Sequence, residues 1–183
     1  KNTFLSYKLF NSSFTGLSIG ILFQIYQPLT PEVYSIGGII LASCMLVIAK
    51  FYEKLLNIKS FYFISIIVEI IILLTVITFL ILQYSLTSAL LIYIGYQLTF
   101  IFGGYLVRAE TLIAPEKDYL GKLDVYKQAG YLTGLASSFI FYKTLEYGFE
   151  IKEPKVQISI LHYCLITLQI IITTLLIKSF KKK

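Results

Sequence analysis

Long apolar runs, separated by short polar turns, constrain the fold of this chain more than any other feature of its sequence. Hydrophobic residues make up 57% of the 183 residues and charged residues only 14%, a balance that departs from that of soluble domains. A helix needs about 20 mostly apolar residues to cross a hydrocarbon core of about 30 Å. We therefore expect an integral membrane protein with roughly six helical spans and no soluble domain of ordinary size.

The apolar runs and their breaks predict an all-α fold in which residues 1–183 form a single six-helix transmembrane domain. The predicted spans are Leu9–Gln27, Val33–Phe51, Ser60–Leu82, Ser85–Val107, Tyr126–Leu145 and Ile158–Ile177. Pro28 and Pro31 close the first run, since proline lacks an N–H and is tolerated in a connection. The sequence has no Gly-rich or Ser-rich linker that would mark a domain boundary.

Basic residues are distributed unevenly between the two sides that these spans define. One side collects 13 of the 16 lysine and arginine residues, and the other has Lys143, Lys152 and Lys155. Cytoplasmic loops carry the excess of positive charge, so we expect both termini in the cytoplasm and place the chain in a bacterial cytoplasmic (inner) membrane. The net charge of +6 needs no nucleic-acid partner, because the same lysines set the topology and attract anionic lipid head groups.

Glu69 is the most costly residue to place in the membrane. It lies nine residues after Ser60, roughly 14 Å into the third span, where a charged carboxylate costs on the order of 2.5–3.5 kcal/mol. Gln97 and Gln169 are expected at similar depth and are candidate hydrogen-bond partners. One interpretation is the proton-binding carboxylate of a coupled transporter, and the other is a protonated Glu69 that joins helices by one hydrogen bond.

Polar side chains are concentrated in the first and fourth predicted spans, which gives these two helices the character of a cavity lining. The candidates for a substrate path are Gln24, Gln27, Tyr93, Tyr96 and Gln97. An alternative for the tyrosines is an aromatic belt at the membrane interface, since the chain has 15 Tyr and no Trp. Tyr96 and Gln97 are expected too deep in the fourth span for that alternative.

The sequence does not favour an enzyme, a metal site or a cofactor. His162 is the sole histidine, and a lone histidine without other ligands at suitable spacing is more often a hydrogen-bonded packing residue than a metal ligand. Cys44 and Cys164 lie inside apolar runs without a partner at short spacing. No nucleophile elbow, HExxH helix or phosphate loop occurs, so we expect no catalytic residues and no cofactor.

Small residues recur at four-residue spacing in two of the predicted spans. Gly16 and Gly20 form a GxxxG pattern in the first span, and Gly130, Gly134 and Ser138 continue such a pattern in the fifth. Small residues let two helix backbones approach closely in a membrane. The pattern therefore predicts close helix packing and does not by itself imply a dimer.

Six spans with both ends inside, a basic link between spans two and three, and an arginine that ends span four before a charged turn resemble one six-helix half of a major facilitator superfamily transporter. The resemblance covers the whole chain. It implies a 3+3 inverted repeat, in which spans one to three correspond to spans four to six. The similar stretches Leu41-Ala42-Ser43 in span two and Leu135-Ala136-Ser137 in span five occupy corresponding positions in such a repeat.

The link between the second and third helices of that family reads roughly Gly-x-x-x-Asp-Arg/Lys-x-Gly. Here Glu53 stands at the acidic position and Lys54 at the basic position, whereas Ala49 and Leu56 replace the two glycines. Arg108 is similar to the arginine at the family's fourth-helix exit. The resemblance implies that Glu53, Lys54 and Arg108 form a cytoplasmic charge network that gates the transport path.

The resemblance also implies a function. The family usually has twelve helices around a central cavity, so a six-helix chain is expected to act as a homodimer, or with a second six-helix membrane chain, and to move a small-molecule substrate by alternating access. A rival hypothesis is a non-transporting membrane scaffold or assembly subunit with the same fold. An intramembrane enzyme would need Glu69 and His162 within hydrogen-bond reach, and their expected depths on opposite sides of the midplane argue against it.

Overall fold

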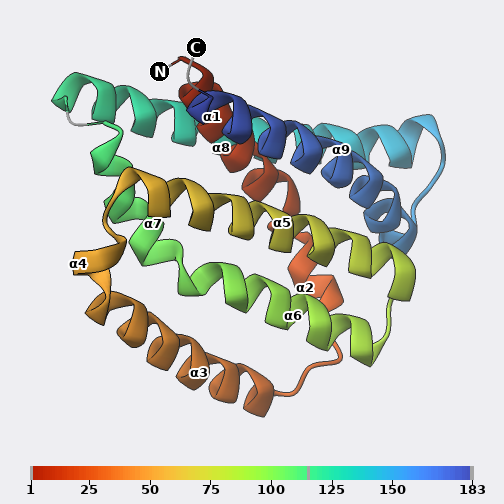
Figure 1. Ribbon diagram of the computed structural model, residues 1–183. Coiled ribbons are helices and arrows are strands. Elements are labelled where there is room, and N and C mark those ends of the chain that lie inside the picture. The colour runs from red at the N-terminus through yellow and green to blue at the C-terminus, as the bar shows by residue number, and fades with distance from the viewer. Residues whose placement is uncertain (1, 115, 182–183) are drawn as a thin grey trace.

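The computed structural model describes residues 2–114 and 116–181, and every regular element within these ranges is a helix (Figure 1). The elements are α1 (Asn2–Ser18), α2 (Ile21–Ile25), α3 (Pro31–Lys50), α4 (Tyr52–Leu55), α5 (Ile58–Leu82), α6 (Leu86–Ile101), α7 (Gly103–Ala109), the 3-10 helix η1 (Glu110–Leu112), α8 (Lys117–Gly148) and α9 (Pro154–Phe180). The all-α prediction is confirmed.

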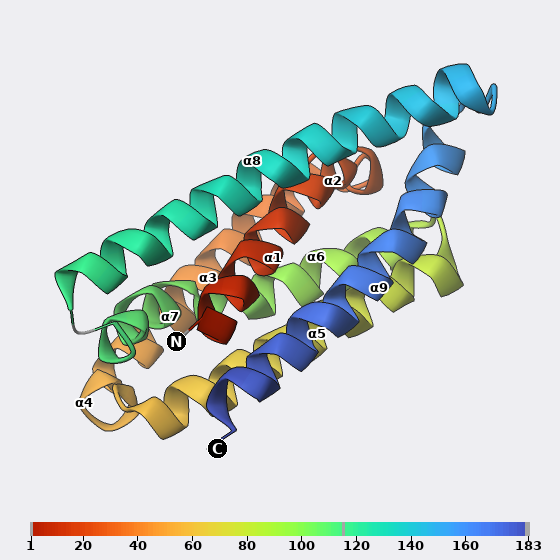
Figure 2. The ribbon, with the colours of Figure 1, turned by 90° about the horizontal axis from the view of Figure 1, so that it is seen from above.

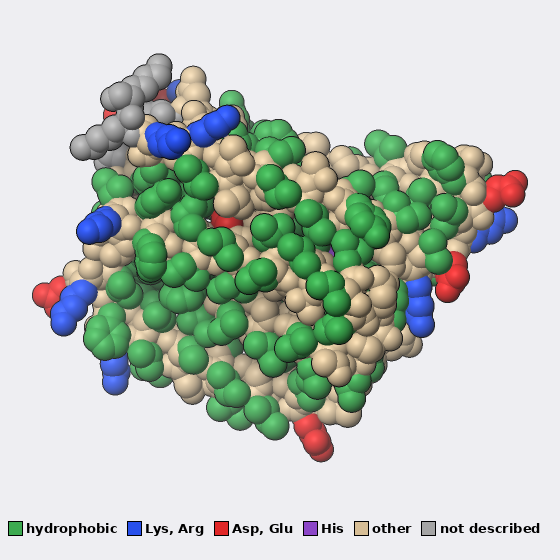
Figure 3. Space-filling view, turned by 45° about the vertical axis from the view of Figure 1, so that its right-hand side comes forward, with side chains coloured by type: hydrophobic (Ala, Val, Ile, Leu, Met, Phe, Trp, Pro, Cys, Tyr) green, Lys and Arg blue, Asp and Glu red, His purple; other side chains and the backbone are tan. Residues whose placement is uncertain are grey.

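Four helical segments are long and apolar enough to cross a membrane. They are Pro31–Lys50, Ile58–Leu82, Leu86–Leu112 and Pro154–Phe180. The face in Figure 3 agrees with this, because hydrophobic side chains cover most of it and charged side chains gather mainly toward its two ends. The chain therefore has the character of an integral membrane protein.

The first and fifth predicted spans correspond to helices whose limits differ from the prediction. Helix α1 begins at Asn2 rather than Leu9, and it stops at Ser18 before a two-residue break that leads into α2. Helix α8 begins at Lys117 rather than Tyr126 and runs for 32 residues. Both starts were predicted too late, because a hydropathy pattern assigns charged residues to loops even where they continue a helix.

Local sequence signals set several of the helix starts. The side chain of Asn57 accepts the N–H of Ser60 at 2.8 Å before α5, and the hydroxyl of Ser85 accepts the N–H of Ser88 at 3.0 Å before α6. Each contact satisfies a first-turn amide that has no partner in the helix. Prolines open α3 and α9, where a missing N–H costs nothing.

Helices α1, α5 and α9 form the centre of the bundle. Helix α1 packs against α8 and α9, α5 packs against α6 and α9, and α3 is held at the edge by α6 (Figures 1 and 2). Helix α3 contributes no fully buried residue, so its apolar surface is almost wholly available to lipid or to another protein. The start of α1 and the end of α9 lie together at one end of the bundle, where the ring centres of Phe4 and Phe180 are 6.1 Å apart (Figure 1).

Glycines allow α1 and α8 to approach closely. A Cβ atom on Gly130 would overlap the backbone oxygen of Leu9, and one on Gly134 would overlap that of Ser13. Gly16, on the opposite helix, is equally confined. The predicted close packing of small residues is therefore confirmed at these three glycines.

Candidate functional site

Glu69 lies at the middle of α5 with only 1% of its surface exposed. Its Oε1 accepts the hydroxyl of Tyr7 at 2.7 Å and the side-chain amide of Asn11 at 3.0 Å. The amide nitrogen of Gln169 donates to Oε2 at 2.6 Å and to the backbone oxygen of Glu69 at 3.0 Å. Side chains from α1, α5 and α9 therefore meet at one buried carboxyl group.

The chemistry of this Glu69 cluster suits an ionised carboxylate. Tyr7, Asn11 and Gln169 all act as donors toward it, and an ionised carboxylate can only accept. A protonated carboxyl group would need an acceptor for its own hydrogen. The side-chain oxygen of Gln169 is buried and has no hydrogen-bond partner, so an inverted amide could provide that acceptor.

Of the two amides expected beside Glu69, Gln169 is confirmed as its partner and Gln97 is not. The side-chain oxygen of Gln97 is buried without a hydrogen-bond partner, and its side chain lines a hollow of about 180 Å³ between α3 and α6. The expected depth of Gln97 is comparable, but α6 packs on the side of α5 opposite to α9 (Figure 1). Depth alone does not define which face of a helix a side chain occupies.

A second buried polar cluster, the Glu110 cluster, lies toward the end of the bundle that holds the termini. The carboxylate of Glu110 pairs with Lys8 of α1 and, at 2.9 Å, with Lys127 of α8. The side chains of Lys8 and Glu110 are 9% and 5% exposed. Buried charges are tolerated when they are paired in this way, so Glu110 compensates two cations from two different helices.

No pattern in the sequence identifies the Glu110 cluster. Lys8 lies ahead of the first predicted span, which starts at Leu9, and Glu110 lies after the fourth, which ends at Val107. Each charge taken alone predicts exposure, because pairing between residues 102 positions apart leaves no local pattern. The only available signal was that the charged stretch after Arg108 contains an acid as well as bases.

The three gate candidates lie on the surface near the same end. Glu53 and Lys54 of α4 are exposed, and so is Arg108 at the end of α7. The guanidinium carbon of Arg108 lies 5.9 Å from the ring centre of Tyr52, a cation–π contact. Within the described part of the chain no ion pair joins Glu53 to Arg108.

On the same surface, Asp118 and Lys122 form the pair that their four-residue spacing indicates, with a distance of 2.7 Å. The hydrogen bond to Asp118 raises the pKa of Lys122. Both side chains are largely exposed, so the pair belongs to the solvated start of α8 and not to the buried clusters.

The five path candidates do not converge on a single cavity. Gln24 and Gln27 are exposed and line a hollow of about 100 Å³ at the end opposite the termini. Tyr93 is buried and packs edge to face against Tyr26 and Tyr34, with ring centres 5.6 and 5.5 Å away. Gln97 lines the separate hollow between α3 and α6.

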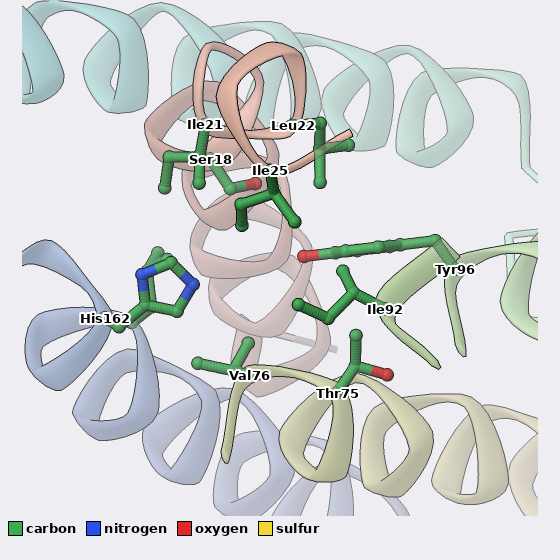
Figure 4. A pocket seen from close by; sticks show the side chains of 10 residues that line it. Ser18, Ile21, Leu22, Ile25, Thr75, Val76, Ile92, Tyr96 and His162 are labelled. Atoms are coloured by element: carbon green, nitrogen blue, oxygen red, sulfur yellow. The ribbon is translucent and has the colours of Figure 1, made fainter. Parts of the chain in front are cut away.

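Tyr96 lines a small internal cavity of about 10 Å³ beside the break between α1 and α2. In Figure 4 the hydroxyl of Tyr96 and the ring of His162 point toward this cavity from opposite sides. A cavity of this size holds about one water molecule. The remaining wall is largely aliphatic, with Ile21, Ile25 and Val76 among its side chains.

His162 occupies a packed position in α9. Its Nδ1 lies 2.8 Å from the backbone oxygen of Ile158, and its ring stacks on Phe79 with ring centres 3.9 Å apart. These contacts fit the packing role expected for a lone histidine. Among residues 2–114 and 116–181, no group of three or more His, Cys, Asp or Glu side chains could hold a metal ion.

Comparison of the chain with family models, curated proteins and solved structures found no match in any of the three.

Proposed function

We propose that this chain is one six-helix half of a membrane transporter similar to the major facilitator superfamily. In this proposal it acts as a homodimer, or with a second six-helix membrane unit, and moves a small-molecule substrate by alternating access. It needs no cofactor and catalyses no covalent reaction. The membrane is a bacterial cytoplasmic membrane, with both termini in the cytoplasm.

Two interrupted helices carry the proposal. The first proposed span is interrupted at Ile19 and Gly20, after α1, and the fourth has one irregular residue, Phe102, between α6 and α7. Interrupted spans at corresponding positions of two repeats are typical of transporters, where they mark the binding region. The two breaks lie toward opposite ends of the bundle (Figure 2), as an inverted repeat requires.

The packing pattern also supports an inverted repeat. An inverted repeat exchanges α1 with α6, α3 with α8, and α5 with α9. Under this exchange, the α1–α8 contact becomes the α6–α3 contact. In the same way, the α1–α9 contact becomes the α6–α5 contact. The α5–α9 contact converts into itself. All five contacts occur, so the set of packed pairs is unchanged by the exchange.

The six-span topology needs two spans beyond the four that length and composition identify. We assign α1 with α2 as the first span and α8 as the fifth. Helix α1 is packed between α8 and α9, so Tyr7, Lys8, Ser13 and Ser18 are buried, whereas Thr15 is exposed. Helix α8 carries charged residues near both ends, from Lys117 to Lys127 and at Lys143 and Glu146, with an apolar stretch between them.

Glu69 is the proton-coupling group in this proposal. A titratable carboxyl group near the midplane, contacted by three helices, can bind one proton and change the interactions of all three. Glu53, Lys54 and Arg108 are the gate candidates, because their exposed positions leave them free to pair with each other or with a partner in another state. Gln24, Gln27, Tyr93, Tyr96 and Gln97 remain the proposed path.

The oligomeric state of the chain in a membrane tests the proposal. Chemical crosslinking and native mass measurement of the full chain in lipid nanodiscs are expected to give a dimer, or a complex with another six-helix chain. The apolar and almost unburied α3 is the expected contact surface, together with α8. A strict monomer that co-purifies with no six-helix partner would contradict the proposal.

One observation favours the rival scaffold function. Gln24, Tyr96 and Gln97 line three separate hollows, whereas a transport path requires them to share one water-filled space in some state. Cysteine substitution at these three positions, followed by reaction with a water-soluble thiol reagent from each side of the membrane, separates the two functions. A transporter exposes all three to water, and a scaffold keeps Tyr96→Cys and Gln97→Cys protected.

A further inference from the structure

We propose that Lys8, Glu110 and Lys127 form an ion latch at the end of the bundle that holds the termini, and that protonation of Glu69 opens this latch through Tyr7 and Lys8. The inference deepens the proposed function by naming how the coupling site acts on the rest of the chain. It rests on that function only for the assignment of Glu69 as the proton-binding group.

The close approach of α1 and α8 creates the need for the latch. Gly130 packs directly against the backbone of Leu9. Leu9 follows Lys8 by one residue, and Gly130 follows Lys127 by three. This packing brings two lysines from neighbouring helices to one level, where the buried Lys8 and the partly exposed Lys127 repel each other. Glu110 pairs with both, so the α1–α8 contact at this level depends on one carboxylate.

Glu110 also ties a connecting segment to the bundle. It forms η1 between α7 and α8, and Ala114 at the end of this segment is only 3% exposed. When Glu110 holds Lys8, η1 is held against α1. Loss of these ion pairs would free η1 to move away and expose Ala114 to water.

Tyr7 connects the latch to Glu69. Its hydroxyl donates to Glu69 at 2.7 Å, while the ammonium of Lys8 lies 5.2 Å from the centre of its ring. A cation over an aromatic face is attracted by the ring, so one buried side chain contacts both clusters. Because Tyr7 and Lys8 are consecutive in α1, neither can shift far without the other.

Charge balance provides the driving force. Lys8, Glu69 and Glu110 are buried, whereas the side chain of Lys127 is 27% exposed. The charge of buried Lys8 is stabilised by its ion pair with Glu110 and by the negative charge of ionised Glu69. A proton on Glu69 removes one of these two negative charges, which is unfavourable for Lys8 in surroundings of low dielectric. Hydration of the lysines then becomes favourable, and hydration requires the latch to open.

The other groups that contact the two clusters are consistent with this coupling. Helix α8 adds Asp124, which lies 3.5 Å from Lys127 and is largely exposed, so water already screens its charge. Helix α9 offers the neutral amide of Gln169. The ionisable side chains that form hydrogen bonds or ion pairs with these clusters include Tyr7, Lys8, Lys127 and Asp124.

Reactivity of a buried cysteine tests the proposal in the full chain in lipid nanodiscs. The background carries Cys44→Ser and Cys164→Ser, Ala114→Cys is the reporter, and its reaction rate with a water-soluble maleimide is normalised to that of exposed Gly121→Cys. We expect the normalised rate to rise as the pH falls. Glu69→Gln is expected to raise it about tenfold at neutral pH, a shift of ~1.4 kcal/mol in the opening equilibrium, and to remove the pH dependence.

Glu110→Gln is expected to raise the normalised reaction rate of Ala114→Cys at every pH. Addition of Glu69→Gln to the Glu110→Gln variant should change this rate no further. The matched control, Asp118→Asn, removes an exposed carboxylate at the start of α8 and should leave the rate unchanged. Tyr7→Phe keeps the aromatic ring and is expected to weaken the pH response, which provides a milder variant if Glu110→Gln does not fold.

Two results would overturn the inference. One is a protected Ala114→Cys in the Glu110→Gln variant, which would mean that no latch exists. The other is a Glu69→Gln variant, or a Tyr7→Phe variant, whose rate and pH response match those of the parent, which would mean that the clusters are independent. Neither result depends on a partner chain, so failure of the inference is distinguishable from failure of the dimer experiment.

Discussion

Glu69 is better supplied with donors than an isolated buried carboxylate would be. Donors from two other helices approach its two oxygens, which offsets much of the cost of burying its charge. Removal of the carboxylate would leave several of these donors without an acceptor. The cost of an unpaired buried donor exceeds the net gain from one hydrogen bond, so the cluster should matter more for stability than a count of its bonds suggests.

Glu69→Ala is therefore expected to lower the free energy of unfolding by about 3 kcal/mol, because Tyr7, Asn11 and Gln169 lose their shared acceptor. Glu69→Gln keeps one carbonyl acceptor, and its expected loss is about 1 kcal/mol. The measurement is reversible unfolding in mixed detergent micelles. Glu53→Ala, at an exposed carboxylate, is the control with little change. Equal losses for the two Glu69 variants would contradict the donor argument.

Sequence reasoning located only part of this site. Depth counting placed Gln169 beside Glu69 correctly, because both lie well inside continuous apolar spans. It could not find Tyr7 or Lys8, since a first span starting at Leu9 left both residues outside the membrane. The charge of Lys8 shifted that boundary, and the residue that neutralises it, Glu110, is 102 positions away.

The α1–α8 pair shows what a glycine pattern can and cannot predict. The spacing of Gly130 and Gly134 indicated a close helix contact, which occurs. The pattern did not identify the partner helix. In the other glycine pair, Gly16 lies in the contact, whereas Gly20 has open space around it and sits in the break between α1 and α2, where a glycine weakens a helix.

Helix α8 offers a matched pair of glycines for a test. Gly134→Ala places a methyl group against the backbone of Ser13 and is expected to destabilise the fold by about 1–3 kcal/mol through overpacking. Gly121→Ala, in the same helix but with open space around it, should instead stabilise it by about 0.5–1 kcal/mol through higher helix propensity. Thermal unfolding in detergent measures both. Destabilisation of similar size at the two positions would show that α1 and α8 do not pack this closely.

At the scale of the whole molecule, the six-span topology depends on α8. Its 32 residues extend for about 48 Å, which exceeds the hydrocarbon thickness of about 30 Å. Charged residues at both ends can therefore lie in water while the apolar middle crosses the membrane. Hydropathy alone identifies four spans and does not include α8. Because α1 covers one side of α8, this helix needs fewer apolar residues than a helix that lipid surrounds.

The six-span topology and a topology with only four spans differ in where they place Lys122 and Glu150 relative to the membrane. If α8 crosses the membrane, Lys122 near its start and Glu150 just after its end lie on opposite sides. If only the four apolar segments cross, the two lie on the same side. Single cysteines, Lys122→Cys and Glu150→Cys, in a background without Cys44 and Cys164 report the difference through a thiol reagent that does not cross membranes.

We expect Lys122→Cys to react only from the cytoplasmic side and Glu150→Cys only from the opposite side. Lys54→Cys and Thr87→Cys, which flank α5, lie on opposite sides in both topologies and calibrate the assay. The expectation follows from charge as well as from length, because the basic start of α8 belongs to the side that carries most of the lysines. If Lys122→Cys and Glu150→Cys react from the same side, α8 does not cross the membrane and there is no fifth span. The correspondence of α3 with α8, on which the inverted repeat depends, would then be wrong.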